Sequence, residues 1–328
     1  MQSSIKTSNK IDIAGVVSCL PNRKILNFDF QDSFTKEEIE KVCNSIGVNS
    51  RFHVKEEVNT SDLCLAAAKH LIEKLRWEIN SIDGIILLTQ TPDFQLPASA
   101  FRLHKLLGLK LETFAFDINL GCSAYPYGLW LASSLMNTGP KRVILLAGDT
   151  ISKIVSPKDR STALLFGDAG SATAIETSSK NNWKFSLGSD GSGMDNIKTD
   201  FGGCLNMNGS KIFEFTLSKI PDLIKNIDEA NSKPHDIYFF HQANSFMLNF
   251  IRKKCKILEE AFPINISEFG NTSSASIPLL MTDYFLKNKI KKKINAALVG
   301  FGVGYSWAAA SLNIKNSTFF DKIFLMDT

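Results

Sequence analysis

The chain has 328 residues, of which 44% are hydrophobic and 21% are charged, and its formal net charge is +4. This composition is ordinary for a globular protein, excludes the disordered and fibrous classes, and requires no nucleic-acid partner. No apolar run approaches the ~18 residues that cross a bilayer, and residues 1–10 are polar with no hydrophobic signal region after them, so we expect a cytoplasmic protein with no membrane partner.

Strand-like and helical segments alternate through the first half of the chain. Runs rich in β-branched and aromatic residues predict strands at residues 11–17, 84–88, 114–118, 143–147 and 172–176. Apolar residues recur at helical spacing in residues 125–136. The polar segment Ser-Ser-Lys-Asn-Asn at 178–182 then predicts a linker, which divides the chain into units of residues 1–178 and 179–328.

The second half repeats this alternation. Strands are predicted at residues 184–188, 237–241, 296–301 and 308–314, and helices at residues 211–227, 244–257 and 277–289. The whole pattern predicts a mixed α/β architecture. In open α/β folds, side chains at the strand ends gather in one crevice, so residues at those positions are the candidates for a functional site.

Cys122 lies at a predicted strand-to-helix turn, in the sequence Gly-Cys-Ser-Ala. The positive end of a helix dipole and free backbone N–H groups can lower the pKa of a thiol from about 8.5 to roughly 3.5–7.5. We therefore expect Cys122 to be a reactive thiolate, the form that attacks thioesters. A cysteine more often serves as a small buried hydrophobic residue, so this feature gains weight only together with others.

A histidine and an asparagine occupy similar places. His241 ends the predicted strand 237–241 in Phe-His-Gln-Ala-Asn, and Asn271 lies in a Gly-Asn-Thr-Ser-Ser turn. Either residue alone is ordinary, but a thiol, an imidazole and a carboxamide at three such positions indicate a cysteine-centred acyl-transfer site. The other histidines and the other five cysteines are expected to be structural. Because the six cysteines include no C-x-x-C pair, neither a metal site nor a disulfide framework is predicted.

In order and spacing, five sequence blocks resemble the β-ketoacyl-acyl-carrier-protein synthase III family over nearly the whole chain. They are the three segments above, Asp159 and Arg160 followed by Leu-Phe-Gly-Asp-Ala-Gly-Ser-Ala at 165–172, and Gly-Phe-Gly-Val-Gly-Tyr-Ser-Trp at 300–307. The resemblance implies a thiolase-like fold, in which two similar α/β halves stack as a five-layer αβαβα sandwich. Residues 1–178 would carry the nucleophile, and residues 179–328 the histidine and asparagine.

The resemblance also implies a role for each site residue. Cys122 would accept an acyl group from acyl-coenzyme A, and His241 and Asn271 would handle a malonyl thioester while it loses carbon dioxide, giving a 3-oxoacyl-carrier protein. The backbone amides of Cys122 and Val303 would form the oxyanion hole. An asparagine at 271 suits this chemistry, because a neutral amide donates hydrogen bonds to an enolate and cannot act as a base.

Several positions bear on the substrates, which the resemblance gives as acyl-coenzyme A and malonyl-acyl carrier protein, with no cofactor. Arg160 and Phe301 are expected to contact substrate. Residues 36–46 lack the tryptophan and arginine that clamp the coenzyme A adenine in better-known members, so we expect that clamp to be absent or rebuilt. The family arginine that guides the acyl carrier protein is also missing after His241, and docking is assigned instead to Arg252, Lys253, Lys254 and Lys256. A second basic cluster at 287–293 is interpreted as a solvated helix end.

Family members are homodimers in which the stretch before the nucleophile reaches the partner's acyl pocket. Here that stretch is residues 91–97, and Phe94 or Leu96 is the expected contact. A surface loop within one subunit is the alternative interpretation.

Three functions remain open from the sequence. The first is the condensing enzyme, either a fatty-acid initiator or a specialised member that makes a short 3-oxoacyl unit for a secondary product or surface polysaccharide. The second is an acyltransferase that passes the acyl group from Cys122 to a hydroxyl or amine, which would need a base where Asn271 stands. The third is a catalytically silent protein that only binds acyl carriers, although such a protein would normally have lost one of the three site residues.

Overall fold

The computed structural model describes residues 5–231, 234–289 and 291–326. Its helices are α1 (Lys36–Ile46), α2 (Thr60–Leu75), α3 (Ser99–Leu107), α4 (Ala124–Met136), α5 (Arg160–Ala163), α6 (Gly209–Asn231), α7 (Ser245–Lys254), α8 (Ile266–Phe269) and α9 (Ser276–Lys287). Its strands are β1 (Lys6–Leu20), β2 (Lys24–Leu26), β3 (Ser50–Phe52), β4 (Gly84–Leu88), β5 (Phe114–Ile118), β6 (Arg142–Asp149), β7 (Ala169–Ser189), β8 (Ile197–Lys198), β9 (Asn206–Met207), β10 (Ile237–Phe240), β11 (Ile294–Gly302), β12 (Ser306–Ile314) and β13 (Phe319–Phe324).

One large sheet runs through the molecule in the order β10-β11-β12-β7-β6-β4-β5, with β1 paired along β7 and β13 along β1. Strands β4, β5 and β6 are mutually parallel, as are β10 and β11. Strands β7 and β12 run antiparallel to their neighbours on this path. Parallel strands end at the same edge of a sheet, so the turns after β4, β5 and β6 lie together.

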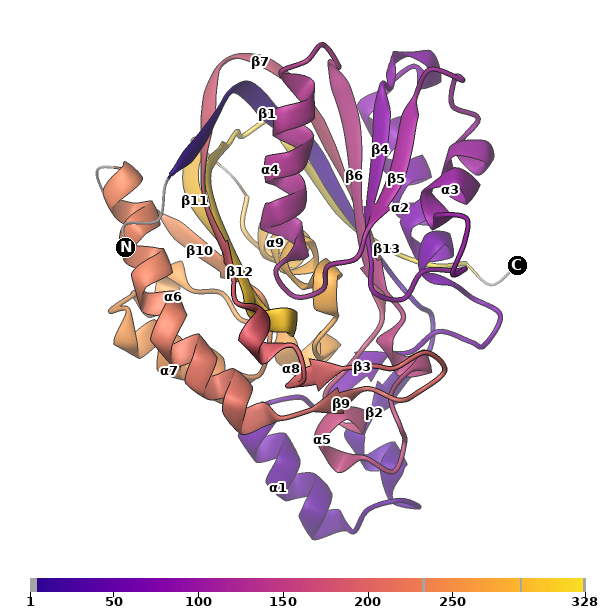
Figure 1. Cartoon of the computed structure of the whole chain (residues 1–328), viewed down its shortest axis with the longest axis vertical. Coiled ribbons are helices and arrows are strands. Elements are labelled where there is room, and N and C mark those ends of the chain that lie inside the picture. Colours follow the sequence, from indigo (N-terminus) through magenta and orange to yellow (C-terminus); the bar gives the residue numbers. More distant parts are fainter. Residues whose placement is uncertain (1–4, 232–233, 290, 327–328) are drawn as a thin grey trace.

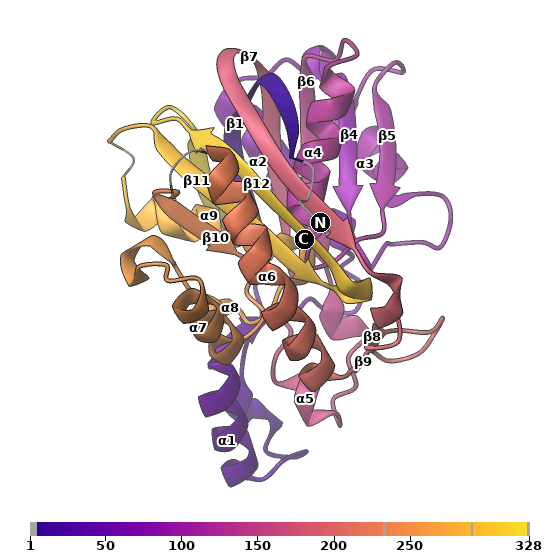
Figure 2. The ribbon, with the colours of Figure 1, turned by 60° about the vertical axis from the view of Figure 1, so that its left-hand side comes forward.

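The helices and strands are arranged in five layers, as Figures 1 and 2 show. In the middle layer, α4 and α9 bury Leu129 and Met281 in one core with residues from both ends of the sheet. On one outer face, α2 and α3 pack on β1, β4 and β6, and on the other α6 and α7 pack on β10, β11 and β12. This is the predicted αβαβα order of layers.

The predicted linker at 178–182 is not a linker, because β7 continues through these residues. The first part of β7 pairs with β6 and the last part with β12, while β1 pairs antiparallel with both parts. The polar residues that predicted a boundary therefore lie inside one long strand. The division into two halves remains a prediction.

Most other elements follow their predictions. Strands β4 and β5 have the predicted limits, and β6, β10, β11 and β12 differ from theirs by a few residues at most. The prediction omitted the helices α1, α2 and α3. Helix α1 begins with a capping box: the Glu38 N–H donates to Thr35 Oγ1 at 3.2 Å, and the Thr35 N–H donates to the Glu38 carboxylate at 3.0 Å. Within the described part of the chain, no helix combines the length and the apolar character that crossing a bilayer requires.

Candidate active site

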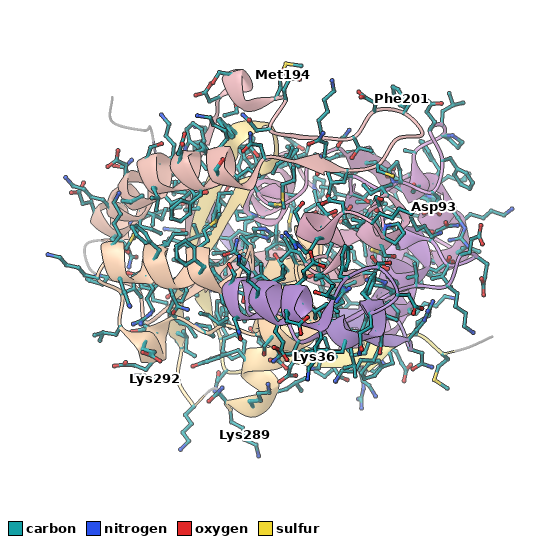
Figure 3. All side chains as sticks on the ribbon, turned by 90° about the horizontal axis from the view of Figure 1, so that it is seen from below. Lys36, Asp93, Met194, Phe201, Lys289 and Lys292 are labelled. Atoms are coloured by element: carbon teal, nitrogen blue, oxygen red, sulfur yellow. The ribbon has the colours of Figure 1, made fainter. Side chains whose placement is uncertain are left out.

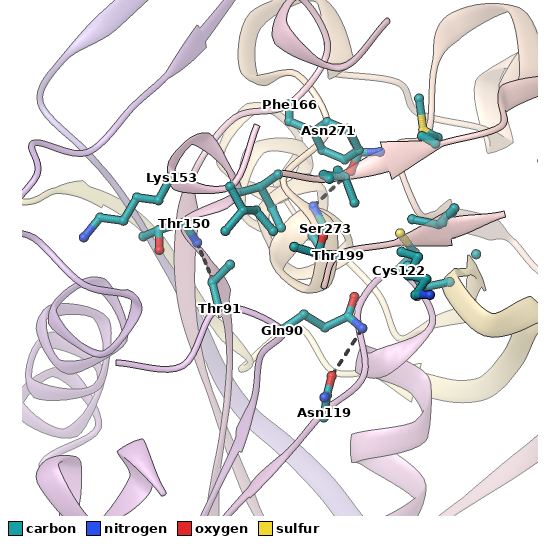
Figure 4. Close-up of a pocket in the computed structure, with 18 of the residues that line it drawn as sticks. Gln90, Thr91, Asn119, Cys122, Thr150, Lys153, Phe166, Thr199, Asn271 and Ser273 are labelled. Atoms are coloured by element: carbon teal, nitrogen blue, oxygen red, sulfur yellow. Dashed lines mark hydrogen bonds between the residues drawn. The ribbon is translucent and has the colours of Figure 1, made fainter. Parts of the chain in front are cut away.

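A cavity of about 950 Å³ lies where the parallel strands end. Its lining includes residues that closely follow β4, β5, β6 and β10, together with the turn that carries Asn271. Cys122, His241 and Asn271 all line it, so the structure brings the three predicted catalytic residues into one space. Figure 4 shows Cys122 and Asn271 at this cavity, with a hydrogen bond joining Ser273 to Asn271.

The end of β11 passes very close to the sulfur of Cys122. A Cβ atom at Gly302 would lie 2.7 Å from Cys122 Cβ and 3.0 Å from Cys122 Sγ, and the φ angle of Gly302 is +155°. The next residue, Val303, lines the cavity, and its backbone N–H and that of Cys122 both interact with the thiol and lower its pKa. The two amides predicted for the oxyanion hole therefore lie at the sulfur.

The thiol of Cys122 is not the low-pKa thiolate that the sequence predicted. Burial raises its pKa to about 12, the carboxylate of Asp149 raises it further, and the two N–H groups only partly oppose this. Helix α4 does begin just after the cysteine, as expected, but burial, which disfavours a charged thiolate, is the largest influence on the thiol pKa. Cys122 is therefore a protonated thiol near neutral pH.

His241 is buried at the same cavity. Its Nδ1 lies 2.6 Å from Ser276 Oγ at the start of α9, and its ring meets Phe301 edge-on with 5.8 Å between ring centroids. Burial lowers the pKa of His241 to about 3, although a hydrogen bond with the backbone of Ser273 opposes the shift. The imidazole is therefore neutral, with one nitrogen that donates and one that accepts. Phe301, a predicted substrate contact, lines the cavity as well.

Asn271 is fixed by its own turn. Its backbone N–H donates to the Leu165 carbonyl at 2.9 Å, and its carbonyl accepts from the Gly167 N–H at 3.0 Å. Its side-chain Oδ1 accepts from the Ser273 N–H at 2.9 Å. Because Oδ1 is used in this way, the Nδ2 donor is left for the cavity, and among the described residues no group accepts a hydrogen bond from it.

A buried carboxylate that the sequence analysis missed holds the strand ends together. Asp149, the last residue of β6, accepts hydrogen bonds from the Gln90 N–H at 2.7 Å and from the hydroxyls of Thr89 and Thr91. It also accepts from both the N–H and the hydroxyl of Ser274, at 3.1 and 2.7 Å. Asp149 thus connects the end of β4 to the turn that carries Asn271. Its place at a strand end was the available signal.

Arg160 does not line the cavity. Its Nη1 is 2.7 Å from Glu38 Oε1, the same glutamate that caps α1. The predicted substrate contact therefore lies in an ion pair with α1. Ile39 of the same helix is buried. A contact between Arg160 and substrate stays a prediction.

The two residues proposed to reach a partner differ in position. Phe94 lines the cavity of its own chain. Leu96 lies outside the lining, and its exposed fraction is 81%. If a side chain of this loop contacts a second subunit, Leu96 is the better candidate.

The four predicted docking cations lie at the end of α7 that is farther from the cavity. Arg252 pairs with Glu259 at 3.4 Å, and Lys254 donates to the Leu217 carbonyl at 3.0 Å. Lys253 and Lys256 are exposed. The cavity end of α7 is aromatic instead, because Phe246 and Phe250 pack on Phe213 of α6 with 5.4 and 5.5 Å between ring centroids. Lys253 and Lys256 are therefore the cations most available to a partner.

One wall of the cavity contains no residue predicted from the sequence. Residues 197–207, which contain the short pair β8 and β9, contribute Ile197, Lys198 and Phe201 among others to the lining. Figure 3 shows Phe201 and Met194 on the opposite edge of the molecule from Lys289 and Lys292. The basic cluster at 287–293 is therefore remote from this wall, and Lys287 pairs with Asp283 at 3.0 Å.

Comparison with known proteins agrees with this geometry. Residues 116–191 match the family model described as 3-Oxoacyl-[acyl-carrier-protein (ACP)] synthase III, and residues 227–314 match its C-terminal model. A Campylobacter jejuni protein named "Putative 3-oxoacyl-[acyl-carrier-protein] synthase 3" is 33% identical over 94% of this chain and 95% of its own. The "Beta-ketoacyl-[acyl-carrier-protein] synthase III" of Clostridioides difficile is 33% identical over 92% of this chain and 98% of its own.

A solved structure gives the same result. A 3-oxoacyl-(acyl-carrier protein) synthase from Burkholderia xenovorans LB400 is 40% identical, with a TM-score of 0.95 over 98% of this chain and 99% of that one. This chain belongs to the β-ketoacyl-acyl-carrier-protein synthase III family. The family resemblance and the thiolase-like fold predicted from the sequence are thereby confirmed, and the chain is a condensing enzyme of the acyltransferase class.

Proposed function

We propose that this synthase III loads an acyl group from an acyl-coenzyme A onto Cys122 and then condenses it with malonyl-acyl carrier protein. The observation that carries the proposal is the convergence of one thiol, one neutral imidazole and one carboxamide donor on a single cavity, with two backbone N–H groups at the sulfur. Each group has a step to perform, and the relatives' names supply the class of substrate.

In the first half-reaction, the sulfur of Cys122 attacks the thioester carbonyl carbon. The thiol is protonated, so its proton must leave as the new bond forms; neutral His241 accepts it and passes it to the departing coenzyme A thiolate. The carbonyl oxygen becomes an oxyanion held by the N–H groups of Cys122 and Val303. Loss of one such donor typically costs about 2.7–4 kcal/mol of transition-state stabilisation.

In the second half-reaction, the malonyl group loses carbon dioxide, and the electron pair moves to the thioester oxygen as an enolate. Asn271 Nδ2 and a ring N–H of His241 donate to that oxygen. The enolate carbon then attacks the acyl-cysteine, the carbon–sulfur bond to Cys122 breaks, and the thiolate regains a proton from solvent. Ser276 Oγ can donate to or accept from Nδ1, so it suits the histidine tautomer of each half-reaction.

The alternative acyltransferase is less well supported, because it needs a base at position 271. The Asn271 amide cannot accept a proton in this way, and its Oδ1 is already bonded to the Ser273 N–H. The silent-binder alternative has no observation in its favour, since Cys122, His241 and Asn271 all line the cavity.

Intact-protein mass spectrometry tests the proposal. Wild type and Cys122→Ala are mixed with a panel of acyl-coenzyme A thioesters and then with malonyl-acyl carrier protein. We expect an added acyl mass on wild type alone, followed by its loss together with release of carbon dioxide. Acylation that the malonyl substrate cannot discharge would favour the acyltransferase. Absence of acylation with every donor would overturn the enzymatic proposal.

We also propose that the enzyme works as a homodimer. Strand β5 is the last strand on its side of the sheet path, and Phe114, Phe116 and Ile118 on it are only partly buried. The nearby segment adds Leu96 and Phe101, with exposed fractions of 81% and 55%. An apolar strand edge of this kind favours pairing with a second copy. Light scattering should give twice the chain mass, and a monomer with full activity would contradict the proposal.

A further inference from the structure

We propose that the acyl group loaded on Cys122 carries a hydroxyl in its first few carbons, and that Gln90 and Asn119 bind that hydroxyl. This inference rests on the proposed function, because it concerns what the thiol accepts. Gln90 lies two residues after β4 and Asn119 directly after β5, and both line the cavity with Cys122.

Polar groups surround the residue that precedes the nucleophile. A Cβ atom at Gly121 would lie 2.2 Å from Gln90 Oε1 and 3.2 Å from Ser273 Oγ. Gln90 Nε2 in turn donates to Asn119 Oδ1 at 3.3 Å, as Figure 4 shows beside Cys122. An acyl chain on the sulfur that extends along this side therefore meets two carboxamides and a hydroxyl.

These side chains are not used to hold the turns. Within the described residues, the side-chain carboxamides of Gln90 and Asn119 form a hydrogen bond with each other and with no other group. In particular, neither side chain bonds to a backbone group among those residues. The backbone of Gln90 is instead fixed by its N–H bond to the buried Asp149 carboxylate at 2.7 Å. A fixed backbone with an uncommitted carboxamide is typical of a binding residue.

Several polar atoms near the thiol have no hydrogen-bond partner among the described residues. They are the acceptor Gln90 Oε1, the donor Asn119 Nδ2 and the hydroxyl Ser273 Oγ. An alkyl chain would cover these groups and remove their water without replacing it, whereas a hydroxyl can both donate and accept. Sites built to bind a hydroxyl discriminate strongly against the analogue that lacks it.

The test compares two donors that differ by one hydroxyl. The initial rate of Cys122 acylation is measured by intact-protein mass spectrometry with 3-hydroxybutyryl-coenzyme A, in both configurations, and with butyryl-coenzyme A. We expect one hydroxylated donor to react at least about tenfold faster with wild type. Gln90→Met, which keeps the side-chain length, should lose this preference and accept butyryl at least as fast.

Asn119→Ala provides an independent variant if Gln90→Met does not fold, and it should reduce the same ratio of rates. Gln31→Met is the matched control, since Gln31 is an exposed glutamine outside the cavity lining, and it should keep the wild-type ratio. Butyryl reacting as fast as both hydroxylated donors with wild type would overturn this inference while leaving the condensing function intact. No acylation by any thioester would instead overturn the proposed function, and this inference with it.

Discussion

Cys122 and His241 both lose water on folding, and burial moves their pKa values in opposite directions. The thiol pKa rises to about 12 and the imidazole pKa falls to about 3, because each environment disfavours the charged form. The pair therefore rests neutral and uncharged. Catalysis must then depend on proton transfer during the reaction and on donors fixed in advance, and Ser276 and Asn271 are such fixed groups.

Ser276→Ala should slow the second half-reaction. The variant removes the oxygen 2.6 Å from His241 Nδ1, so the ring keeps only its hydrogen bond with the Ser273 backbone and can no longer exchange donor and acceptor roles with a hydroxyl. We expect the rate of carbon dioxide release from malonyl-acyl carrier protein to fall by about tenfold or more, within the usual range for a general acid or base. Ser192→Ala, at an exposed serine, is the control. An unchanged rate of decarboxylation in Ser276→Ala would refute this role.

At the scale of single elements, turns at the ends of strands bring the chemistry together. The end of β11 approaches the sulfur so closely that only a residue without a side chain can stand there. Helix α7 packs aromatic side chains on α6 and has exposed cations at its C-terminal end. Each arrangement gives a prediction.

Gly302→Ala should abolish acylation of Cys122 by blocking the sulfur. The added Cβ would come within 3.0 Å of Sγ, and the φ angle of +155° disfavours any side chain. Gly304→Ala separates the two causes, because Gly304 also has a positive φ (+67°) but a Cβ there meets nothing within 4 Å. We expect mass spectrometry to show a far greater loss of acylation in Gly302→Ala. Equal losses would mean that backbone strain, and not access to the thiol, is the cause.

The double variant K253E/K256E should weaken use of the carrier protein. Reversing one exposed cation on α7 and one just after its C-terminal end would repel an acidic partner, so we expect KM for malonyl-acyl carrier protein to rise about threefold to tenfold. The KM for malonyl-coenzyme A should stay unchanged. K289E/K292E makes the same charge change on the opposite edge of the molecule from Phe201 (Figure 3) and serves as the control. If both double variants raise KM equally, the effect is one of net charge and not of docking.

At the scale of the whole molecule, the fold buries titratable groups far from the thiol as well. Burial lowers the pKa of His53 to about 4, and it raises the pKa of Asp168 to about 6. These shifts connect the pH to the free energy of unfolding, because a group that binds protons differently in the folded and unfolded chain makes that free energy depend on pH.

Acidification from pH 7 to pH 5 should destabilise the protein. Unfolded histidines titrate near 6.5, so below that pH the unfolded chain binds protons that folded His53 and His241 refuse, and stability falls. Asp168 acts in the opposite sense, since its folded form holds a proton below about pH 6, and Asp117, whose pKa burial also raises by a smaller shift, acts with it. We expect the two histidines to outweigh them between pH 7 and pH 5. Urea unfolding at pH 5, 6 and 7 measures the slope, and His53→Gln should reduce it. A midpoint that rises on acidification would contradict this balance.

The α/β class, most of the central strands and the three residues that meet in the cavity could be predicted from the sequence. The spacing of apolar residues, the positions of strand ends and the residue types are all local signals. Three other features depend on contacts between residues far apart in the sequence, and local signals do not predict them. Residues 178–182 look like a linker and are the middle of β7, because β1 supplies hydrogen bonds along both parts of that strand. The thiol pKa rises because the cysteine is buried, and its position just before a helix in the sequence does not reveal that burial. That Gln90, Asn119 and Asp149 lie close together could not be predicted from the sequence, because the order of strands β5, β4 and β6 in the sheet is what brings them to the same edge.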